Sequence, residues 1–206
     1  MSPEPRRHFS MLRDFRAADF FTLANGFAGS GAILAFMRFC AGERASFFWI
    51  GTALIPVALL MDILDGRVAR LRNEVSPLGQ ELDSLADVVS FGVAPTAMAF
   101  ACGMRGEGDA LCFMYFVACG ISRLARYNVT AASLSTASGK VRYFEGMPIP
   151  SSLLLVALLA VLFALGYRGP QLSVWQLGPV SLHPLALLYV AHGSAMISKT
   201  LRIPKL

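Results

Sequence analysis

Long stretches without a charged side chain dominate this sequence. One of them runs from Ala45 to Met61, seventeen residues without an Asp, Glu, Lys or Arg. A helix that crosses a bilayer needs about 17 to 25 predominantly apolar residues. Over the whole chain 55% of the residues are hydrophobic and 15% are charged, against roughly 25% charged residues in soluble domains. The sequence therefore predicts an all-α integral membrane protein.

Six regions have, or nearly have, the length and composition of membrane spans. They are Phe20–Met37, Ala45–Leu64, Leu82–Met104, Ala110–Leu124, Gly146–Tyr167 and Pro179–Ser198. The basic stretch before them has no apolar core of the kind that a secretory signal carries. We expect residues 1–19 to form a cytoplasmic or interfacial segment with a short amphipathic helix on the membrane. Residues 20–206 should form one six-helix membrane domain.

Lysine and arginine residues divide unequally between the two sides of a six-span chain. Fourteen of them fall on the side of both termini, and four, Arg38, Arg44, Arg105 and Arg168, fall on the other. Because cytoplasmic loops are enriched in these residues, we expect both termini to face the cytoplasm. The net charge of +5 follows from this bias and suits anionic lipid headgroups. It gives no reason to expect a nucleic-acid partner.

Two pairs of aspartates flank a short break between the second and third apolar runs. Asp62 and Asp65 are three residues apart, and Asp83 and Asp87 are four apart, so each pair shares one face of a helix. The Ser-Pro pair at 76–77 predicts the start of a new helix after the break. A helical hairpin of this kind could turn all four carboxylates toward one cavity.

Four carboxylates in one cavity would repel one another. A like-charge pair 4 Å apart costs about 4 kcal/mol at an effective dielectric constant of about 20, so the acids must be protonated or hold cations. Oxygen ligands favour hard divalent ions such as Mg2+ or Mn2+, and two such ions would balance the charge and suit displacement at phosphorus. Small residues in register would leave room for a phosphate-bearing substrate. A simpler alternative is that the acids are solvated helix-end charges paired with neighbouring arginines.

The spacing of these residues resembles the signature of the CDP-alcohol phosphotransferase family. Eight positions over 26 residues match that signature without departure: Asp62-x2-Asp65-Gly66-x2-Ala69-Arg70-x8-Gly79-x3-Asp83-x3-Asp87. The resemblance implies six transmembrane helices in a homodimer, with the site open to the cytoplasm. It also implies that an alcohol attacks the lipid-bearing phosphate of a CDP-linked donor and that CMP leaves.

The resemblance assigns roles to the eight positions. Asp62, Asp65 and Asp83 are expected to be metal ligands. Asp87 is expected to lie by the metals as well and to be the general base that takes the proton of the attacking hydroxyl. The remaining four are expected at the nucleotide and its phosphates: Gly66, Ala69, Arg70 and Gly79.

Further stretches resemble the branch of the family that transfers a phosphatidyl group from CDP-diacylglycerol to L-serine. They are TLANGFAG (22–29), SFGVAP (90–95), SRLARYNV (122–129) and FEGMPIP (144–150). Within the first of them, Asn25 is a polar residue in an apolar run. It is expected either to touch the nucleotide or to form a hydrogen bond between helices.

Two arginines could select serine as the acceptor. Serine carries a carboxylate, which a guanidinium binds well, and Arg123 and Arg126 share a helix face near the end of the fourth run. Snorkelling of both side chains to the interface is the competing explanation. The other acceptors considered are glycerol 3-phosphate, inositol and choline. An intramembrane prenyltransferase and a cation transporter are alternatives of different kinds, and the transporter would leave Gly66, Ala69, Gly79 and Arg70 unexplained.

Overall fold

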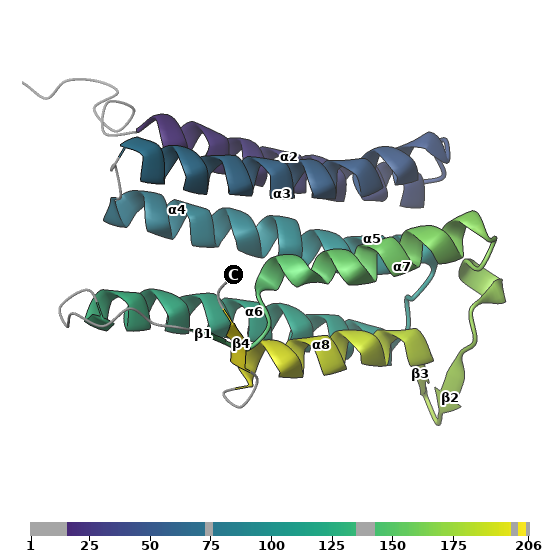
Figure 1. The fold of residues 1–206 in the computed structure, drawn as a ribbon. Coiled ribbons are helices and arrows are strands. Elements are labelled where there is room, and N and C mark those ends of the chain that lie inside the picture. The colour runs from purple at the N-terminus through teal and green to yellow at the C-terminus, as the bar shows by residue number, and fades with distance from the viewer. Residues whose placement is uncertain (1–15, 73–75, 135–142, 199–201, 205–206) are drawn as a thin grey trace, which may run out of the picture.

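The apolar runs form a bundle of long helices in the computed structural model, which describes residues 16–72, 76–134, 143–198 and 202–204 (Figure 1). The helices are α2 (Ala17–Cys40), α3 (Ser46–Arg72), α4 (Pro77–Asp87), α5 (Ala94–Cys102), α6 (Glu107–Leu134), α7 (Leu153–Ala164) and α8 (Leu187–Ile197). Shorter turns are the π-helical η1 (Val88–Val93) and the 3-10 turns η2 (Ile149–Ser152), η3 (Gly169–Gln171) and η4 (Pro184–Ala186). Two antiparallel strand pairs complete the fold, β1 (Tyr143–Glu145) with β4 (Arg202–Pro204) and β2 (Trp175–Leu177) with β3 (Val180–Leu182).

Four helices of the described part are long and apolar enough to cross a membrane. They are Ala17–Cys40, Ser46–Arg72, Pro77–Cys102 and Glu107–Val129, and they overlap the first four predicted runs. The fifth and sixth runs contain the shorter apolar helices Ile149–Ala164 and Pro184–Ile197. The prediction of an all-α membrane fold is confirmed. That the chain crosses the membrane six times stays a prediction. Of the predicted interfacial segment, residues 1–15 lie outside the described residues.

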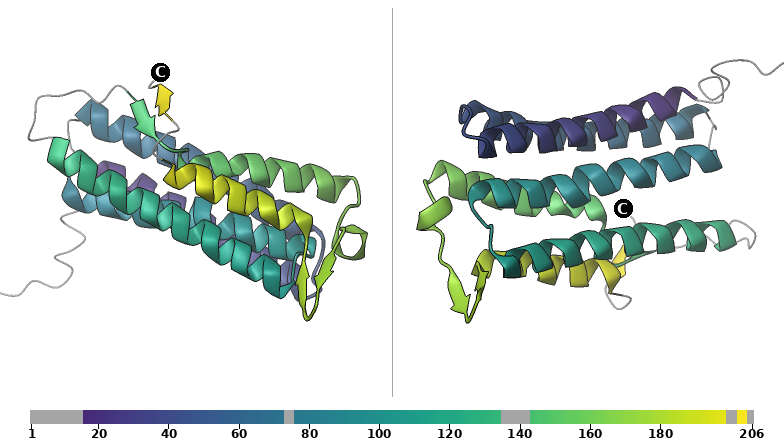
Figure 2. Two further views of the ribbon diagram at one scale, coloured as in Figure 1. Left: turned by 90° about the horizontal axis from the view of Figure 1, so that it is seen from below. Right: turned by 180° about the vertical axis from the view of Figure 1, so that it is seen from behind.

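The helices are arranged in three layers, with α2 and α3 in one, α4, α5 and α7 in the next, and α6 with α8 in the last (Figures 1 and 2). The end of α3, the start of α4 and the end of α6 lie at one end of the bundle, which we call the acidic end. The β2–β3 pair lies at the opposite end, which we call the hairpin end. The shorter helices α7 and α8 run along only the half of the bundle next to the hairpin end (Figure 1).

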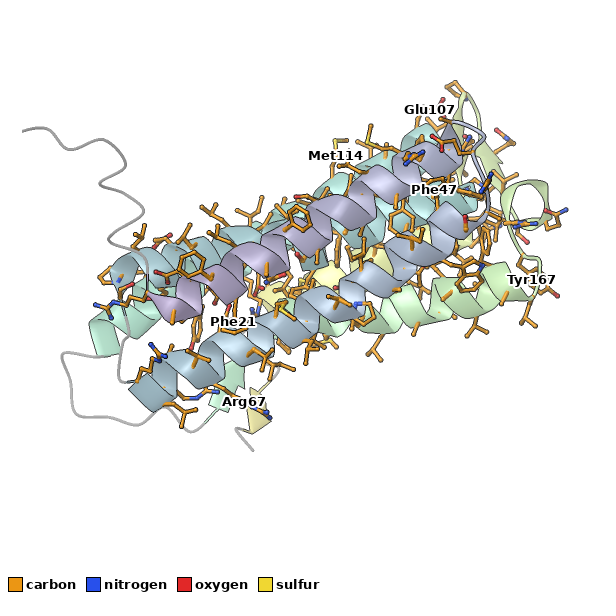
Figure 3. All side chains as sticks on the ribbon, turned by 90° about the horizontal axis from the view of Figure 1, so that it is seen from above. Phe21, Phe47, Arg67, Glu107, Met114 and Tyr167 are labelled. Atoms are coloured by element: carbon orange, nitrogen blue, oxygen red, sulfur yellow. The ribbon has the colours of Figure 1, made fainter. Side chains whose placement is uncertain are left out.

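Side chains on the outside of the bundle are largely apolar. Met114 points outward from α6 with 59% of its surface exposed, whereas Arg67 and Glu107 lie at opposite ends of the bundle (Figure 3). Exposed apolar side chains along the length of a bundle are unfavourable in water and favourable against lipid tails. This distribution is that of an integral membrane protein.

The break between α3 and α4 is formed as predicted. Ser76 is the N-cap of α4, and its Oγ accepts a hydrogen bond from the Gly79 amide at 2.9 Å. Pro77 occupies the first turn, where its missing N–H leaves no carbonyl unpaired. The two aspartate pairs are therefore carried by consecutive helices.

A π-helical turn separates α4 from α5. The Ala94 amide donates to the carbonyl of Val89, five residues earlier, instead of the usual four. Pro95 follows directly, and proline removes an i→i−4 hydrogen bond from a helix. The wider turn therefore continues the helix past a residue that would otherwise break its hydrogen-bond ladder.

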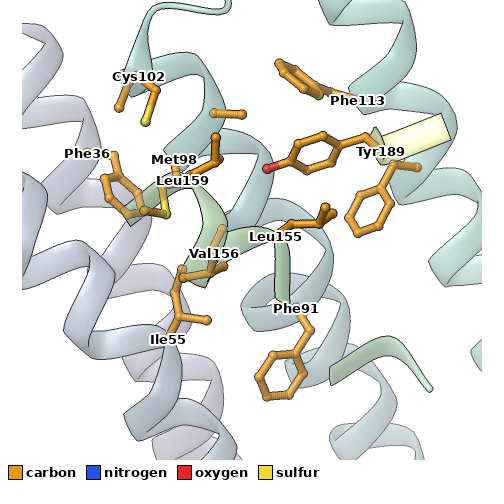
Figure 4. Close-up of a cluster of buried hydrophobic side chains, with 14 of the residues drawn as sticks. Phe36, Ile55, Phe91, Met98, Cys102, Phe113, Leu155, Val156, Leu159 and Tyr189 are labelled. Carbon is orange, nitrogen blue, oxygen red and sulfur yellow. The ribbon is translucent and has the colours of Figure 1, made fainter. Parts of the chain in front are cut away.

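The hydrophobic core lies in the half of the bundle next to the hairpin end. Phe36, Ile55, Met98 and Leu159 pack together from four helices (Figure 4). Tyr189 lies within the same core at 1% exposure, and its hydroxyl donates to the Pro95 carbonyl at 2.8 Å. This buried hydroxyl is satisfied, as buried polar groups generally are, and it ties α8 to α5.

A buried aspartate fastens the hairpin end. Asp109, at the start of α6, accepts hydrogen bonds from the Gly106 amide at 2.8 Å and the His183 amide at 2.7 Å. Its Oδ2 also lies 2.6 Å from Nδ1 of His183. Nearby, Glu107 accepts from both the amide and the hydroxyl of Ser181. These contacts hold the β2–β3 pair against α6, far from the aspartate pairs of α3 and α4.

Candidate active site

Three of the four predicted acids form a cluster between α3 and α4. One carboxylate oxygen each from Asp62, Asp83 and Asp87 lies within 4.8 Å of the others. The Asp62 and Asp83 carboxyls are close enough to interact electrostatically. Asp87 is the most buried of the three, with 6% of its surface exposed. The helical hairpin thus brings Asp62 of the first pair together with both acids of the second pair.

The fourth acid, Asp65, is held apart from this cluster. The Thr22 hydroxyl of α2 donates to its Oδ2 at 2.8 Å, and both side chains are buried. Asp65 is still close enough to Asp62 and Asp83 to interact with them electrostatically. The expectation that all four carboxylates converge is therefore met by three, because α2 supplies a competing partner for the fourth.

Asn25 of α2 contacts the cluster directly. Its Nδ2 donates to Oδ1 of Asp87 at 3.1 Å, and its backbone carbonyl accepts a hydrogen bond from the Ser90 hydroxyl at 3.0 Å. Two roles were predicted for Asn25, and the structure shows one of them, a hydrogen bond between two helices, α2 and α4. Its Oδ1 is buried and has no hydrogen-bond partner among the described residues.

The predicted glycines have different surroundings. A Cβ on Gly79 would lie 2.8 Å from Oδ1 of Asp19, so this position is small because the first turn of α2 packs against it. A Cβ on Gly66 would meet only the Arg70 guanidinium, at 3.5 Å. Arg70 itself is exposed, and Ala69 is half-buried beside it. The nearest neighbours of a side chain at Gly66 would thus be atoms of an exposed, flexible guanidinium.

The two candidate serine-binding arginines lie on α6 but differ in their contacts. Nη1 of Arg126 donates to the carbonyl of Ile197 at the end of α8, at 3.4 Å. Nε of Arg123 is buried without a hydrogen-bond partner among the described residues, and its charge interacts with that of Asp87. Arg123 is therefore close enough to Asp87 to interact with it electrostatically, whereas Arg126 is hydrogen-bonded to the end of α8.

A chain of polar side chains joins α4 to α6 beside the cluster. Nδ2 of Asn128 donates to the Ser84 hydroxyl at 3.0 Å, and Nε2 of Gln80 donates to Oδ1 of Asn128 at 3.4 Å. The Ser84 hydroxyl donates in turn to the Gln80 carbonyl at 3.1 Å. This chain fixes the helix that carries Asp83 relative to the one that carries Arg123.

The donor set of the cluster suits a divalent cation. All three groups offer carboxylate oxygens, the ligands that hard ions such as Mg2+ and Mn2+ prefer. Oδ1 of Asp83 is buried and has no hydrogen-bond partner among the described residues. Buried polar atoms are normally paired, so a cation ligated here would satisfy both this atom and the repulsion between the acids.

Several residues on the face of α2 that carries Asn25 were not predicted individually. Asp19 and Thr22 precede Asn25 at intervals of three, and Gly29 follows four residues later. All four are buried in α2. This helical periodicity marks one polar face of an otherwise apolar helix, and it is the signal that could have identified the face of α2 that packs against α3 and α4.

Comparison with known proteins agrees with the fold and the cluster. Residues 15–192 match the sequence profile described as CDP-alcohol phosphatidyltransferase. A CDP-diacylglycerol–serine O-phosphatidyltransferase of Saccharomyces cerevisiae is 44% identical over 203 residues, which cover 96% of this chain and 74% of that protein. Proteins of the same name are 42% identical in Helicobacter pylori strain 26695 over 53% of this chain, and 36% identical in Bacillus subtilis over 56% of it. The aligned parts are 45% and 65% of those two bacterial proteins.

The fold and the cluster define an integral membrane protein with an acidic site between two of its spans. The chain belongs to the CDP-alcohol phosphatidyltransferase family, whose profile covers most of its length. Members of this family depend on a divalent metal, and the cluster of Asp62, Asp83 and Asp87 could bind one.

Proposed function

We propose that this protein transfers the phosphatidyl group of CDP-diacylglycerol to the hydroxyl of L-serine, releasing CMP and forming phosphatidylserine. The observation that carries the proposal is Arg123, whose Nε is buried without a partner among the described residues and whose charge interacts with that of Asp87. A cation near a phosphotransfer site suits an acceptor that carries a carboxylate. The yeast relative, named for the same reaction, is 44% identical over 96% of this chain.

Asp87 is the proposed general base. Its second carboxylate oxygen, the one not bonded to Asn25, accepts the proton of the serine hydroxyl. The hydroxyl oxygen then attacks the phosphorus of the lipid-bearing phosphate. A new O–P bond forms, the bond from that phosphorus to the CMP oxygen breaks, and CMP leaves with the electron pair. The proton passes from Asp87 to solvent at the acidic end.

Asp62, Asp65 and Asp83 are the proposed metal ligands, with Asp87 beside them. When bound, Mg2+ or Mn2+ would neutralise the carboxylates and stabilise charge on the phosphate oxygens. Four carboxylates suit two such ions. Asp65 would have to exchange or share its hydrogen bond with Thr22 to take part.

The donor is proposed to lie over the small residues of α3. Gly66 and Ala69 carry little or no side chain there, and Arg70 is exposed beside them, so its guanidinium could bind phosphate oxygens in bidentate fashion. Gly79 is proposed to contact the nucleotide as well, although packing against Asp19 already accounts for the absence of a side chain.

Of the two arginines, Arg123 is the proposed ligand of the serine carboxylate. Arg126 already donates a hydrogen bond to the carbonyl of Ile197. We therefore assign Arg126 to holding the end of α8 against α6. A choline acceptor would place a second positive charge beside Arg123, whereas glycerol 3-phosphate would suit a cation. Glycerol 3-phosphate is therefore the main competing acceptor.

The topology and assembly are part of the proposal. The acidic end carries Arg67 and Arg70, with Arg123 and Arg126 on the adjoining part of α6, and the lysine and arginine count of the sequence supports a cytoplasmic position for it. The active site and both termini would then face the cytoplasm, with residues 1–19 on the membrane surface. A homodimer is proposed from family resemblance.

CMP release by the purified protein in detergent tests the function. CDP-diacylglycerol is supplied with Mg2+ or Mn2+, and L-serine is compared with glycerol 3-phosphate, inositol and choline. Serine-dependent release that is lost in Asp87→Asn supports the proposal. Release with a different alcohol would keep the chemistry and refute the acceptor, and metal flux without CMP release would favour a transporter.

Arginine variants test the acceptor site. Arg123→Ala should raise the KM for serine by about 10- to 100-fold, since a charge-assisted pair contributes about 1.5–3 kcal/mol, and should leave the KM for the donor nearly unchanged. Arg44→Ala is the matched control, because Arg44 is exposed at the far end of α2 and α3. An equal rise in the serine KM for Arg126→Ala would contradict the separate roles of the two arginines.

A further inference from the structure

We infer that Asn25 is a positioning residue that fixes the orientation of the Asp87 carboxylate for proton transfer. The inference rests on the proposed role of Asp87 as general base, and it gives Asn25 a function other than contact with the nucleotide. It follows from a set of contacts that joins α2 to the end of α4 and to η1.

The Asn25 side chain is placed to hold one carboxylate oxygen. Asn25 has 0% of its surface exposed, and its Nδ2 lies 3.1 Å from Oδ1 of Asp87. A carboxylate only accepts hydrogen bonds, so the amide nitrogen must be the atom that faces it. With Oδ1 of Asp87 occupied in this way, its other oxygen is the one presented to a substrate hydroxyl.

The backbone of Asn25 is held as firmly as its side chain. The Ser90 hydroxyl donates to the Asn25 carbonyl at 3.0 Å. One turn further along α2, a Cβ on Gly29 would lie 2.7 Å from Cα of Ser90, so only glycine allows the two helices this close. Asn25 is thus fixed to residues 87 and 90 at once, and the direction of its amide is determined by the packing of α2 on η1.

The free-energy cost of burying the Asn25 amide argues against a role in packing alone. Oδ1 of Asn25 is buried without a partner among the described residues, and an unpaired buried polar atom costs about 1–3 kcal/mol. An apolar side chain would avoid that cost in a membrane span. The hydrogen bond to Asp87 is the contact that an apolar residue could not replace.

Kinetics of Asn25→Ala test the role. We expect kcat to fall by about 10- to 100-fold, the usual effect of removing a group that orients a ligand or base. The KM for CDP-diacylglycerol and the calorimetric affinity for CDP should stay within about twofold of wild type, because a group that acts only through the base does not change donor binding. The thermal unfolding midpoint in detergent reports whether the variant is folded.

Two further variants keep the test decisive. Ser90→Ala removes the bond to the Asn25 carbonyl and should lower kcat in the same direction by a smaller factor. Thr52→Ala removes a comparable bond, from the Thr52 hydroxyl to the Phe48 carbonyl at 2.8 Å, in a part of α3 remote from the acids, and should leave kcat unchanged. If Asn25→Ala does not fold, the kcat of Ser90→Ala relative to that of Thr52→Ala tests the inference.

Three results would overturn the inference. One is an unchanged kcat in Asn25→Ala, or in Ser90→Ala if the first variant does not fold. Another is a raised donor KM and weakened CDP affinity with normal kcat, which would make Asn25 a nucleotide contact. The last is the absence of CMP release with every alcohol, which would remove the role of Asp87. Activity with an alcohol other than serine would refute only the proposed acceptor, and the variants would then be measured with that alcohol.

Discussion

Replacing one acid of the cluster should stabilise the protein without metal and destabilise it with metal. The change is Asp83→Asn. Oxygens of Asp62, Asp83 and Asp87 lie within 4.8 Å of one another, and a like-charge pair at that distance costs about 3.5 kcal/mol at an effective dielectric constant of about 20. The substitution removes two of the three repulsive pairs, and the new amide can donate to a neighbouring carboxylate.

Only part of that repulsion is expected as a gain in stability. Asp62 and Asp83 are half-buried, so protons and solvent ions relieve some of it in the wild type. We expect an increase in the free energy of unfolding of about 1–3 kcal/mol in EDTA, which raises the unfolding midpoint by roughly 2–10 °C for a chain of this size. Wild type should gain about 2.7 kcal/mol from a divalent ion at one hundred times its Kd, and Asp83→Asn should gain much less.

The assay is thermal unfolding in detergent, followed by circular dichroism in EDTA and in Mn2+. Glu81→Gln is the matched control, since it removes one negative charge from an exposed position of the same helix. The expected order is variant above wild type in EDTA and wild type above variant in Mn2+. If the order is the same in both conditions, or if wild type does not respond to Mn2+, the three acids do not act as a cation site.

Three further substitutions test the packing at the two ends of the bundle. Gly79→Ala should lower the free energy of unfolding by about 1–3 kcal/mol, because its Cβ would lie 2.8 Å from Oδ1 of Asp19. Gly66→Ala should cost less, because the nearest atoms to its Cβ belong to a flexible guanidinium at 3.5 Å. Equal thermal unfolding midpoints for the two variants would contradict this. Asp109→Ala leaves the Gly106 and His183 donors unpaired and should cost at least about 1–3 kcal/mol, while the KM for both substrates stays unchanged. A change in either KM would show that the hairpin end is coupled to the acid cluster.

Features with a local cause could be predicted from the sequence. The helices follow from the length of the apolar runs, and the break at Ser76 follows from its cap and the proline after it. The later helices were predicted to begin too early. Residues 146–148 of the fifth run are not helical, since Pro148 and Pro150 oppose a helix there, and the sixth run starts with strand β3 before its helix.

Contacts between helices could not be read from the sequence. Thr22 and Asp65 are 43 residues apart, and Arg126 and Ile197 are 71 apart. Whether such groups meet depends on how whole helices rotate and approach, which is set by small residues such as Gly29 and not by the hydropathy of either segment. Asp62, Asp83 and Asp87 lie on consecutive helices of one hairpin, so their convergence could be expected from the spacing. The separate positions of Asp65 and Arg126 depend on contacts with α2 and α8 and could not.

The π-helical turn η1 makes the third span two helices with different angular registers. Each residue of an α-helix turns the chain by about 100°, so the one extra residue in the turn sets the angle between the acids of α4 and the apolar residues of α5. A residue gained or lost within Val88–Val93 would rotate Asp83 and Asp87 away from α3 while α5 kept its place in the core. The same change in the loop after Cys102 would leave the acids where they are, so the two halves of this span tolerate insertions and deletions very differently.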